Sequence, residues 1–279
     1  MTSGGWRGGP TRRLAAALVA LALAAGAGCG GGGEPRAARE PAPIVRETAG
    51  GGQPPIVTET VGRGVQQSTI LRPDVPGPLP VVVFLHGWGA PDPAFYRPWL
   101  EHLARRGNAV VYPRYQDSFV EPPRQALGNV LAAVRIALER RPAQPRTLVV
   151  AGHSAGGALA ADYAAIARTA GVPAPRAVFA AYPGRRLPRV PRGLPEIPPA
   201  LIPASTRVQA LASRGDGVVG TATARAIVRG ARRVPRDRRR LVLMRDPAVA
   251  DHQAPQRADA ASRRTFWAAL DRLIARARR

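Results

Sequence analysis

Residues 146–157 read RTLVVAGHSAGG, an apolar run that leads through a glycine-rich turn into an alanine-rich segment. This order predicts a strand, a tight turn and a helix, with the pattern Gly-x-Ser-x-Gly at 152–156. A serine at the apex of such a turn is strained and exposes its hydroxyl, and Gly152 and Gly156 leave room for the neighbouring backbone. Ser154 is therefore the candidate nucleophile.

The turn also places Ser154 at the start of the following helix. There the backbone N–H of Ala155 can donate to a developing oxyanion, and the helix dipole favours negative charge. The same pattern occurs by chance in many proteins, where the serine is an idle residue of a glycine-rich loop. The strand-like residues 148–150 and the helical composition after the turn favour the catalytic interpretation, because an idle loop does not predict them.

The 279 residues suffice for one large α/β domain or for two small ones. No internal repeat is present and composition does not change past residue 55, which favours one catalytic domain over 55–279. Expected strands at 81–85, 108–112, 148–150, 176–182, 208–213 and 241–244 alternate with helical segments such as 93–106, 125–140 and 258–278. This alternation predicts a doubly wound, mostly parallel sheet flanked by helices, with edge strands between residues 56 and 72.

Residues 1–28 have the layout of a secretory signal peptide, with three arginines before an uncharged run rich in leucine and alanine. The run is short for a helix that spans a bilayer, although a transmembrane anchor is the alternative. Residues 26–29, Gly-Ala-Gly-Cys, resemble the lipobox of bacterial lipoproteins, with Gly26 in place of the aliphatic residue that this pattern prefers. The resemblance implies a lipidated Cys29, a flexible tether over 29–54 and anchoring at the cell envelope, with secretion as the alternative.

The net charge of +23 predicts attraction to anionic surfaces. All 41 basic residues are arginine, and alanine, glycine and proline are abundant, which is typical of a GC-rich genome. No basic motif interleaved with aromatic residues is present, so we expect no specific nucleic-acid partner. We expect a monomer.

The strand 81–85 runs into His86-Gly87-Trp88-Gly89, which resembles the His-Gly oxyanion loop of esterases and lipases. The resemblance implies that the Trp88 N–H is a second oxyanion donor and that its ring forms a wall of the acyl pocket; a packing role for the ring is the alternative. Residues 183–203 hold seven prolines where such enzymes insert a lid, and the segment is short enough to predict a minimal lid and an open site.

Asp216 directly follows the expected strand 208–213, where a carboxylate can accept the N–H of a catalytic imidazole; an ordinary turn aspartate is the alternative. His252 is the only histidine after Ser154 and is the candidate base. Asp251 is a competing acid, but an adjacent residue cannot easily reach its neighbour's Nδ1. The expected helix 93–106 buries Phe95, Trp99, Leu100 and Leu103 and leaves His102 in solvent.

With these pieces in place, the chain from Ile56 onward resembles the α/β-hydrolase superfamily, in particular its dienelactone-hydrolase-like and cutinase-like polyester-hydrolase members. The resemblance implies cleavage of a small or polymeric ester, with Ser154 as nucleophile, His252 as base and Asp216 as its orienting acid, and with Trp88 and Ala155 as oxyanion donors. It also implies a structural His153 whose imidazole faces away from the base.

No metal or other cofactor is expected, because the four histidines are scattered and no ligand spacing appears. Two alternatives stay open. One is a catalytically silent binding lipoprotein on the same fold, and the other is a serine peptidase or acyltransferase with the same three residues.

Overall fold

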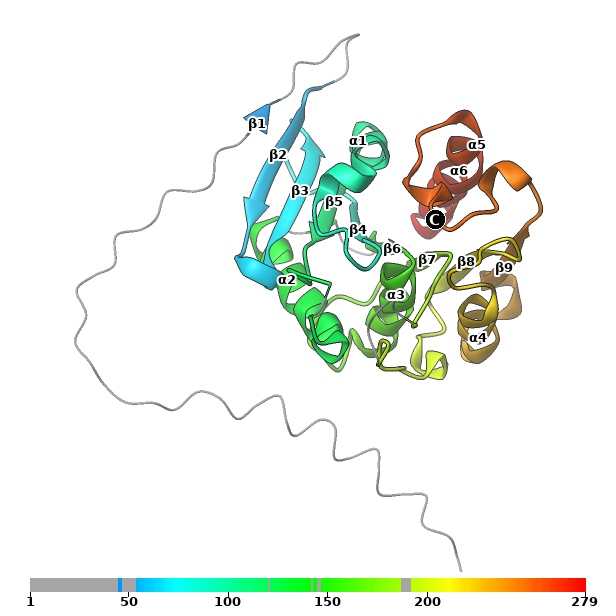
Figure 1. Ribbon diagram of the computed structural model, residues 1–279. Coiled ribbons are helices and arrows are strands. Elements are labelled where there is room, and N and C mark those ends of the chain that lie inside the picture. The colour runs from blue at the N-terminus through cyan, green and yellow to red at the C-terminus, as the bar shows by residue number, and fades with distance from the viewer. Residues whose placement is uncertain (1–44, 47–53, 120, 142, 145–146, 187–191) are drawn as a thin grey trace, which may run out of the picture. The chain divides into compact units, whose positions relative to one another are not determined.

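The computed structural model describes residues 45–46, 54–119, 121–141, 143–144, 147–186 and 192–279, all within the unit Ala42–Arg279 (Figure 1). The predicted signal peptide, Cys29 and most of the predicted tether lie outside these residues. Two tether residues, Val45 and Arg46, form a short strand that pairs with the next one. In the described part of the chain, no helix has the length and apolar character that a membrane span requires.

The described residues form one sheet of nine strands in the order β1-β2-β3-β5-β4-β6-β7-β8-β9. The first three strands and the β3–β5 pair are antiparallel, and all later pairs are parallel. The predicted mostly parallel sheet is thus confirmed. The strands are β1 Val45–Arg46, β2 Ile56–Val61, β3 Ser68–Pro73, β4 Val81–Leu85, β5 Ala109–Pro113, β6 Val149–His153, β7 Ala177–Ala181, β8 Arg207–Ser213 and β9 Arg239–Met244.

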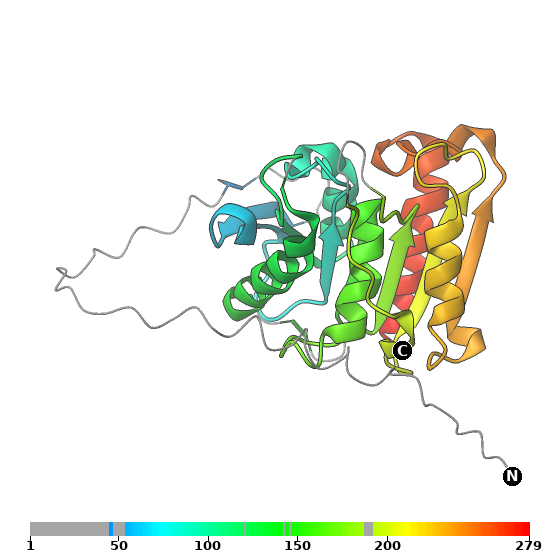
Figure 2. The same ribbon diagram turned by 60° about the horizontal axis from the view of Figure 1, so that its bottom comes forward.

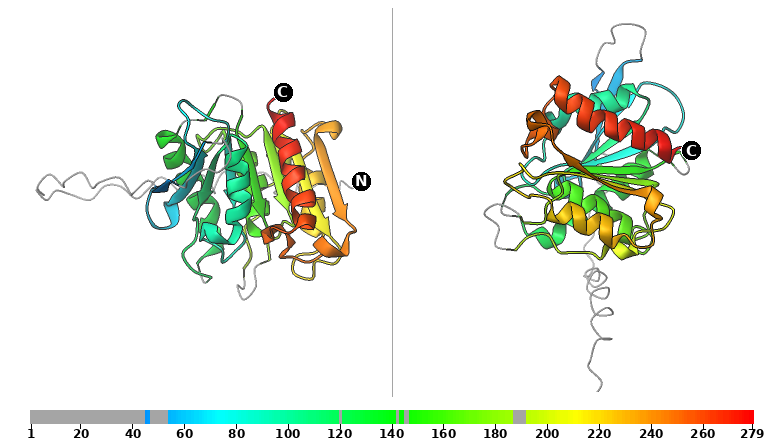
Figure 3. Two further views of the ribbon diagram at one scale, coloured as in Figure 1. Left: turned by 90° about the horizontal axis from the view of Figure 1, so that it is seen from above. Right: turned by 90° about the vertical axis from the view of Figure 1, so that its right-hand side faces the viewer.

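Helices cover both faces of this sheet, as the two views of Figure 3 show. The helices are α1 Arg97–Arg105, α2 Ala126–Arg140, α3 Ala155–Ile166, α4 Ala222–Gly230, α5 Ala260–Ser262 and α6 Ala268–Ala277. Alternate residues of a strand point to opposite faces, so β4 contributes Val82 and Phe84 to the core under α1 and α6. Its Val81, Val83 and Leu85 pack under α2, α3 and α4. The predicted doubly wound α/β fold is confirmed.

Two predicted helices differ from the structure in ways that affect packing. The segment 93–106 begins with a 3-10 turn, Pro93–Tyr96, and only then becomes α1. As a result Phe95 is 49% exposed while Tyr96 is buried, so the prediction that Phe95 belongs to the buried face was wrong. The C-terminal helix, orange to red in Figure 2, contains a π-helical turn at Arg263–Trp267 between α5 and α6.

Backbone strain is concentrated where the parallel strands end. The described residues other than glycine with positive φ are Tyr115 (36°), Ser154 (56°) and Tyr182 (45°), which follow β5, β6 and β7. Strain of this kind persists where surrounding contacts enforce it, and it clusters at functional sites. In the sheet, β4 lies between β5 and β6, so the strand order reverses at β4. In α/β sheets, ligand crevices form beside such a reversal, at the carboxyl ends of the strands.

The segment between β7 and β8 contains no large insertion in its described part. Apart from residues 187–191, which lie outside the description, it holds a single 3-10 turn at Pro199–Leu201. Arg185 fastens it to α3 through two bonds to the buried carboxylate of Asp162, at 2.7 and 2.9 Å. The described part of this segment therefore fits the predicted minimal lid.

Candidate active site

Ser154 occupies the strained turn that the sequence predicts between β6 and α3. Its φ of 56° and ψ of −122° differ from helical values, and α3 starts at the next residue. A Cβ on Gly152 would lie 2.3 Å from the Gly156 carbonyl oxygen, and one on Gly156 would lie 2.1 Å from that of Leu85. Gly152 is therefore required for the turn to close on itself, and Gly156 for the turn to pack against the end of β4.

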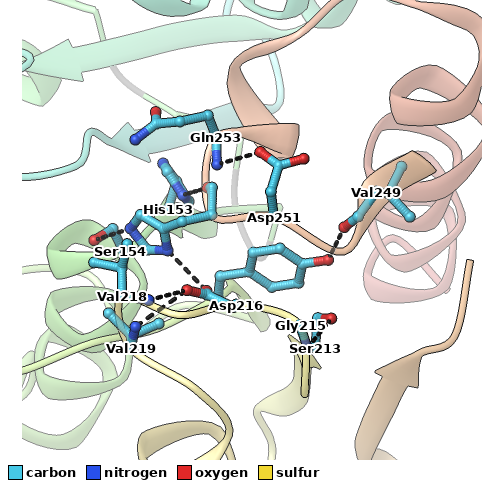
Figure 4. A network of polar contacts seen from close by, with 12 residues as sticks. His153, Ser154, Ser213, Gly215, Asp216, Val218, Val219, Val249, Asp251 and Gln253 are labelled. Carbon is cyan, nitrogen blue, oxygen red and sulfur yellow. Dashed lines mark hydrogen bonds and ion pairs between the residues drawn. The ribbon is translucent and has the colours of Figure 1, made fainter. Parts of the chain in front are cut away.

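The structure brings Ser154, His252 and Asp216 together from three separate segments. Ser154 and Asp216 are labelled in Figure 4. The Ser154 Oγ lies 2.9 Å from His252 Nε2, and His252 Nδ1 lies 2.8 Å from Asp216 Oδ2. A carboxylate only accepts, so His252 donates from Nδ1 and its Nε2 is free to accept the serine proton. This tautomer is the one that a general base for Ser154 needs.

Asp216 is held as a carboxylate in a fully buried position. Its second oxygen accepts the N–H groups of Val218 and Val219, at 2.9 and 3.1 Å. Burial alone would raise the pKa of Asp216, but the hydrogen bonds from His252 and from these two N–H groups outweigh it and lower the pKa. Asp216 can therefore stay charged beside the imidazole.

Asp251, the competing acid, bonds Arg257 and the Gln253 N–H and not the His252 ring. Its side chain is 52% exposed and forms an ion pair with Arg257 at 2.8 Å. It also accepts the Gln253 N–H at 3.0 Å, which fixes the turn that carries His252. Of the two aspartates, Asp216 alone bonds the ring of His252.

Two main-chain N–H groups remain available beside Ser154. In the loop after β4, Gly87 donates to the Tyr96 hydroxyl at 3.0 Å, Gly89 to Gln116 Oε1 at 2.8 Å, and Ala90 to the Gly87 carbonyl at 3.1 Å. Trp88 and Ala155, the two predicted oxyanion donors, have no acceptor for their N–H among the described residues. Unpaired donors at the start of a helix and in a neighbouring loop can stabilise a developing negative charge.

The indole ring of Trp88 is tied to its own surroundings. Its Nε1–H donates to the Phe119 carbonyl at 3.0 Å, and the Phe119 ring, 59% exposed, covers Gly89 so closely that a Cβ there would lie 2.0 Å from it. Packing within the loop accounts for these contacts of the Trp88 ring, and contact between the ring and a substrate stays a prediction.

His86 anchors the start of the oxyanion loop. Its ring is buried, stacks on Tyr115 at 4.0 Å, and places each nitrogen 2.7 Å from a carbonyl oxygen, of Gly87 and of Arg114. Burial lowers the pKa of His86 to about 4, so at neutral pH the ring donates to one of these carbonyls only. Tyr115 in turn donates to the His86 carbonyl at 2.6 Å.

Two predictions about the other histidines were wrong. His153 faces the base: its Nε2 lies 2.9 Å from the His252 carbonyl oxygen, and the two rings lie 4.8 Å apart. His102 is only partly exposed; it bonds Asp271 at 2.9 Å and lies against Trp267, which joins α1 to the C-terminal helix. Both errors arose because ring direction depends on contacts distant in the sequence.

Three side chains that support the site were not predicted, namely Tyr96, Gln116 and Gln256. Tyr96 and Gln116 hold N–H groups of the loop after β4, and Gln256 bonds the Tyr96 hydroxyl at 3.3 Å. None belongs to a motif. A buried tyrosine or glutamine must satisfy its polar atoms, but the sequence does not show which of these residues is buried.

Metal ligands do not gather in the described part of the chain, where no group of three or more His, Cys, Asp or Glu residues could hold an ion.

Comparison with known proteins agrees with this fold. Residues 82–203 match the family described as alpha/beta hydrolase fold. No curated protein matches the sequence. Together with the sheet order and the strained serine turn, the match supports an α/β-hydrolase fold for this chain.

Solved structures share the fold at low sequence identity. A putative dienelactone hydrolase from Klebsiella pneumoniae is 18% identical with a TM-score of 0.58, over 79% of this chain and 98% of that one. Esterase B from Lactobacillus rhamnosis, solved in a form inhibited by a tributyrin phosphonate, is 17% identical with a TM-score of 0.59, over 80% and 86%. A fungal esterase from Rhizomucor miehei is 20% identical with a TM-score of 0.57, over the same shares.

Proposed function

We propose that this protein is a serine hydrolase that cleaves carboxylic esters through an acyl-enzyme intermediate. The observation that carries the proposal is the contact chain Ser154–His252–Asp216, set beside the unpaired N–H groups of Trp88 and Ala155. Nucleophile, base, orienting acid and oxyanion donors are the groups that acyl transfer requires.

In the proposed first step, Ser154 Oγ attacks the ester carbonyl while His252 Nε2 takes the serine proton. The carbonyl oxygen becomes an oxyanion that accepts the N–H groups of Trp88 and Ala155. His252 then gives its proton to the leaving alcohol as the C–O bond breaks. In the second half, His252 takes a proton from water, the hydroxide attacks the acyl-enzyme, and the proton returns to Ser154 as the acid leaves.

The choice of esters over other acyl substrates is supported by the neighbours' names, which include two esterases. The short described segment between β7 and β8 leaves Ser154 half-exposed, which favours a small ester or the surface of a polymer. A serine peptidase or acyltransferase would use the same groups, and a silent binding protein would not need two donors left unpaired beside a bonded serine.

The test is hydrolysis of p-nitrophenyl esters from acetate to palmitate, and of tributyrin, by the parent and by Ser154→Ala and His252→Ala. Each variant should lose at least about 10⁴-fold in kcat/KM. His102→Ala is the matched control, since His102 also bonds an aspartate but lies between α1 and the C-terminal helix; it should retain the parent rate.

Activity that disappears in both site variants and survives in the control establishes Ser154 and His252 as catalytic residues. An inactive parent on every ester would overturn the proposal and favour the binding-protein or peptidase alternatives. Activity that survives Ser154→Ala would assign the nucleophile elsewhere.

From the sequence alone we also propose that the protein is exported and held at the cell envelope through a lipid on Cys29. Incorporation of labelled palmitate by the full chain, lost in Cys29→Ser, is the expected result. If the cell removes residues 1–28 but the mature protein carries no palmitate label, the protein is secreted without an anchor.

A further inference from the structure

The Tyr96 hydroxyl joins three segments beneath the site. Tyr96 closes the 3-10 turn before α1, and its ring packs against Phe84 of β4 at 5.1 Å. Its oxygen lies 2.7 Å from His153 Nδ1, 3.0 Å from the Gly87 nitrogen and 3.3 Å from Gln256 Nε2. The residue is fully buried, so each of these contacts is made without competition from water.

The His252 carbonyl fixes which atom donates in each hydrogen bond of His153 and Tyr96. The His252 carbonyl oxygen can only accept, so His153 Nε2 carries the proton that it shares at 2.9 Å. Burial, and next the charge of His252, lower the pKa of His153 to about 3, so its ring is neutral and Nδ1 is an acceptor. The Tyr96 hydroxyl therefore donates to Nδ1.

The Tyr96 oxygen then accepts from Gly87 and Gln256, and every donor and acceptor in the group is satisfied. The resulting chain of bonds starts at the main chain of His252 and ends at the main chain of Gly87, one residue before the donor Trp88. The loop lies directly on this chain, since a Cβ on Gly87 would be 3.2 Å from the Tyr96 hydroxyl and 3.4 Å from His153 Nδ1.

We propose that Tyr96 and His153 are positioning residues that fix the separation between the catalytic base and the oxyanion donor Trp88. This inference rests on the proposed function and deepens it. The base and the oxyanion donors must act on one bound carbonyl, and a displacement of about 1 Å can cost roughly 100-fold in rate. A polar bridge between their two main-chain segments keeps both in place while neither Tyr96 nor His153 touches the substrate.

Tyr96→Phe removes the bridging hydroxyl and keeps the ring. We expect kcat to fall about 10-fold or more with KM changed less than about 2-fold, because alignment for the transition state is lost rather than ground-state binding. Tyr163→Phe is the matched control: Tyr163 is equally buried, and its hydroxyl bonds the Pro173 carbonyl at 3.1 Å, away from the site. It should leave kcat unchanged at a comparable cost in melting temperature.

A double-mutant cycle with His153→Leu tests whether the two residues act as one unit. The fold-loss in kcat of the double variant should be clearly smaller than the product of the fold-losses of the two single variants. The reason is that either change alone breaks the same chain of hydrogen bonds. Equal kcat losses in Tyr96→Phe and Tyr163→Phe, or strictly multiplicative losses in the cycle, would overturn the bridge.

A second readout does not depend on activity. Nitrogen-15 NMR of the full chain labelled at histidine should show His153 as the neutral Nε2–H tautomer at pH 7, and Tyr96→Phe should shift its Nδ1 resonance. An Nδ1–H tautomer or a charged ring overturns the inference, even in a protein that hydrolyses esters. If the parent is inactive but the tautomer is as expected, the proposed function fails while the bridge stands.

Discussion

The two halves of the site are built differently. The proposed oxyanion half comprises the loop 86–90 and the turn 153–157; its proposed working groups are main-chain N–H donors, and buried side chains such as Tyr96 and His86 hold the loop that carries one of them. The proton-transfer half comprises Asp216 and the segment 245–257; its working groups are side chains on loops whose remaining polar contacts are largely exposed. Rigidity in the first half comes from burial, and in the second from three hydrogen bonds to one carboxylate.

The difference suggests how each half responds to change. In the proton-transfer half, we expect removal of a single group to remove a step of the proposed reaction and to leave the fold intact. In the oxyanion half, a change in a supporting group disturbs packing, so loss of stability accompanies loss of rate.

The largest expected effect is that of Asp216→Asn. The amide cannot stabilise an imidazolium and favours the wrong tautomer of His252, so kcat should fall roughly 10⁴-fold. Ester hydrolysis and thermal unfolding should be measured side by side, with Asp251→Asn as the matched control at near-parent activity. A variant that keeps more than a tenth of the activity would show that another group orients His252.

The next effect concerns pH and the two buried histidines of the oxyanion half. Burial lowers the pKa of His86 to about 4 and of His153 to about 3, below the ordinary value of 6.5. The unfolded chain therefore binds more protons than the folded one below pH 6.5, and stability present above that pH is lost as the pH falls. Each histidine should lower the free energy of unfolding by about 2 kcal/mol at pH 5 relative to pH 7.

Denaturant unfolding between pH 7 and pH 5 measures this loss. A stability that is flat across the range would mean that the two rings are not buried neutral. His153→Leu removes one of the two groups and should reduce the slope with pH by about half.

Gly156→Ala should destabilise the protein by at least about 3 kcal/mol, because its Cβ would meet the Leu85 carbonyl at 2.1 Å and neither β4 nor the turn can move freely. Gly128→Ala is the matched control in α2, with no atom within 4 Å of the new Cβ. It should instead stabilise by about 0.5 to 1 kcal/mol. Chemical denaturation of both variants checks the pair, and similar values for the two would contradict the packing argument.

The smallest effect is expected at the exposed pair Asp251–Arg257 in the proton-transfer half. Both side chains are well exposed, so Asp251→Asn should change the unfolding free energy by less than about 1 kcal/mol. This change should become smaller at high salt, because salt screens the ion pair. A loss of 2 kcal/mol or more in denaturant unfolding would show that the loop carrying His252 depends on this pair.

Much of the fold and part of the site could be predicted because the signals are local. The apolar runs at 81–85 and 148–150 predict central strands by composition, and Gly152, Ser154 and Gly156 define the turn by steric need. His252 could be chosen because the chain offers one histidine after Ser154. These inferences need only chain order and the known direction of parallel strands.

The supporting groups could not be predicted, because their partners are distant in the chain. Tyr96 meets a histidine 57 residues away, and His153 meets a carbonyl 99 residues away. The position of Phe95 shows the same limit: a 3-10 turn rotated it outward and Tyr96 inward, which helical periodicity does not describe.

The sequence by itself thus determined most of the order of strands and helices along the chain, the strained serine turn and the candidate base, since each follows from local sterics or from elimination. Only the tertiary structure decided which way the His153 ring points, which N–H groups stay unpaired and which of two aspartates bonds His252. The physical reason is that a hydrogen bond inside the core is set by the packing of several segments at once, and no single segment carries that information.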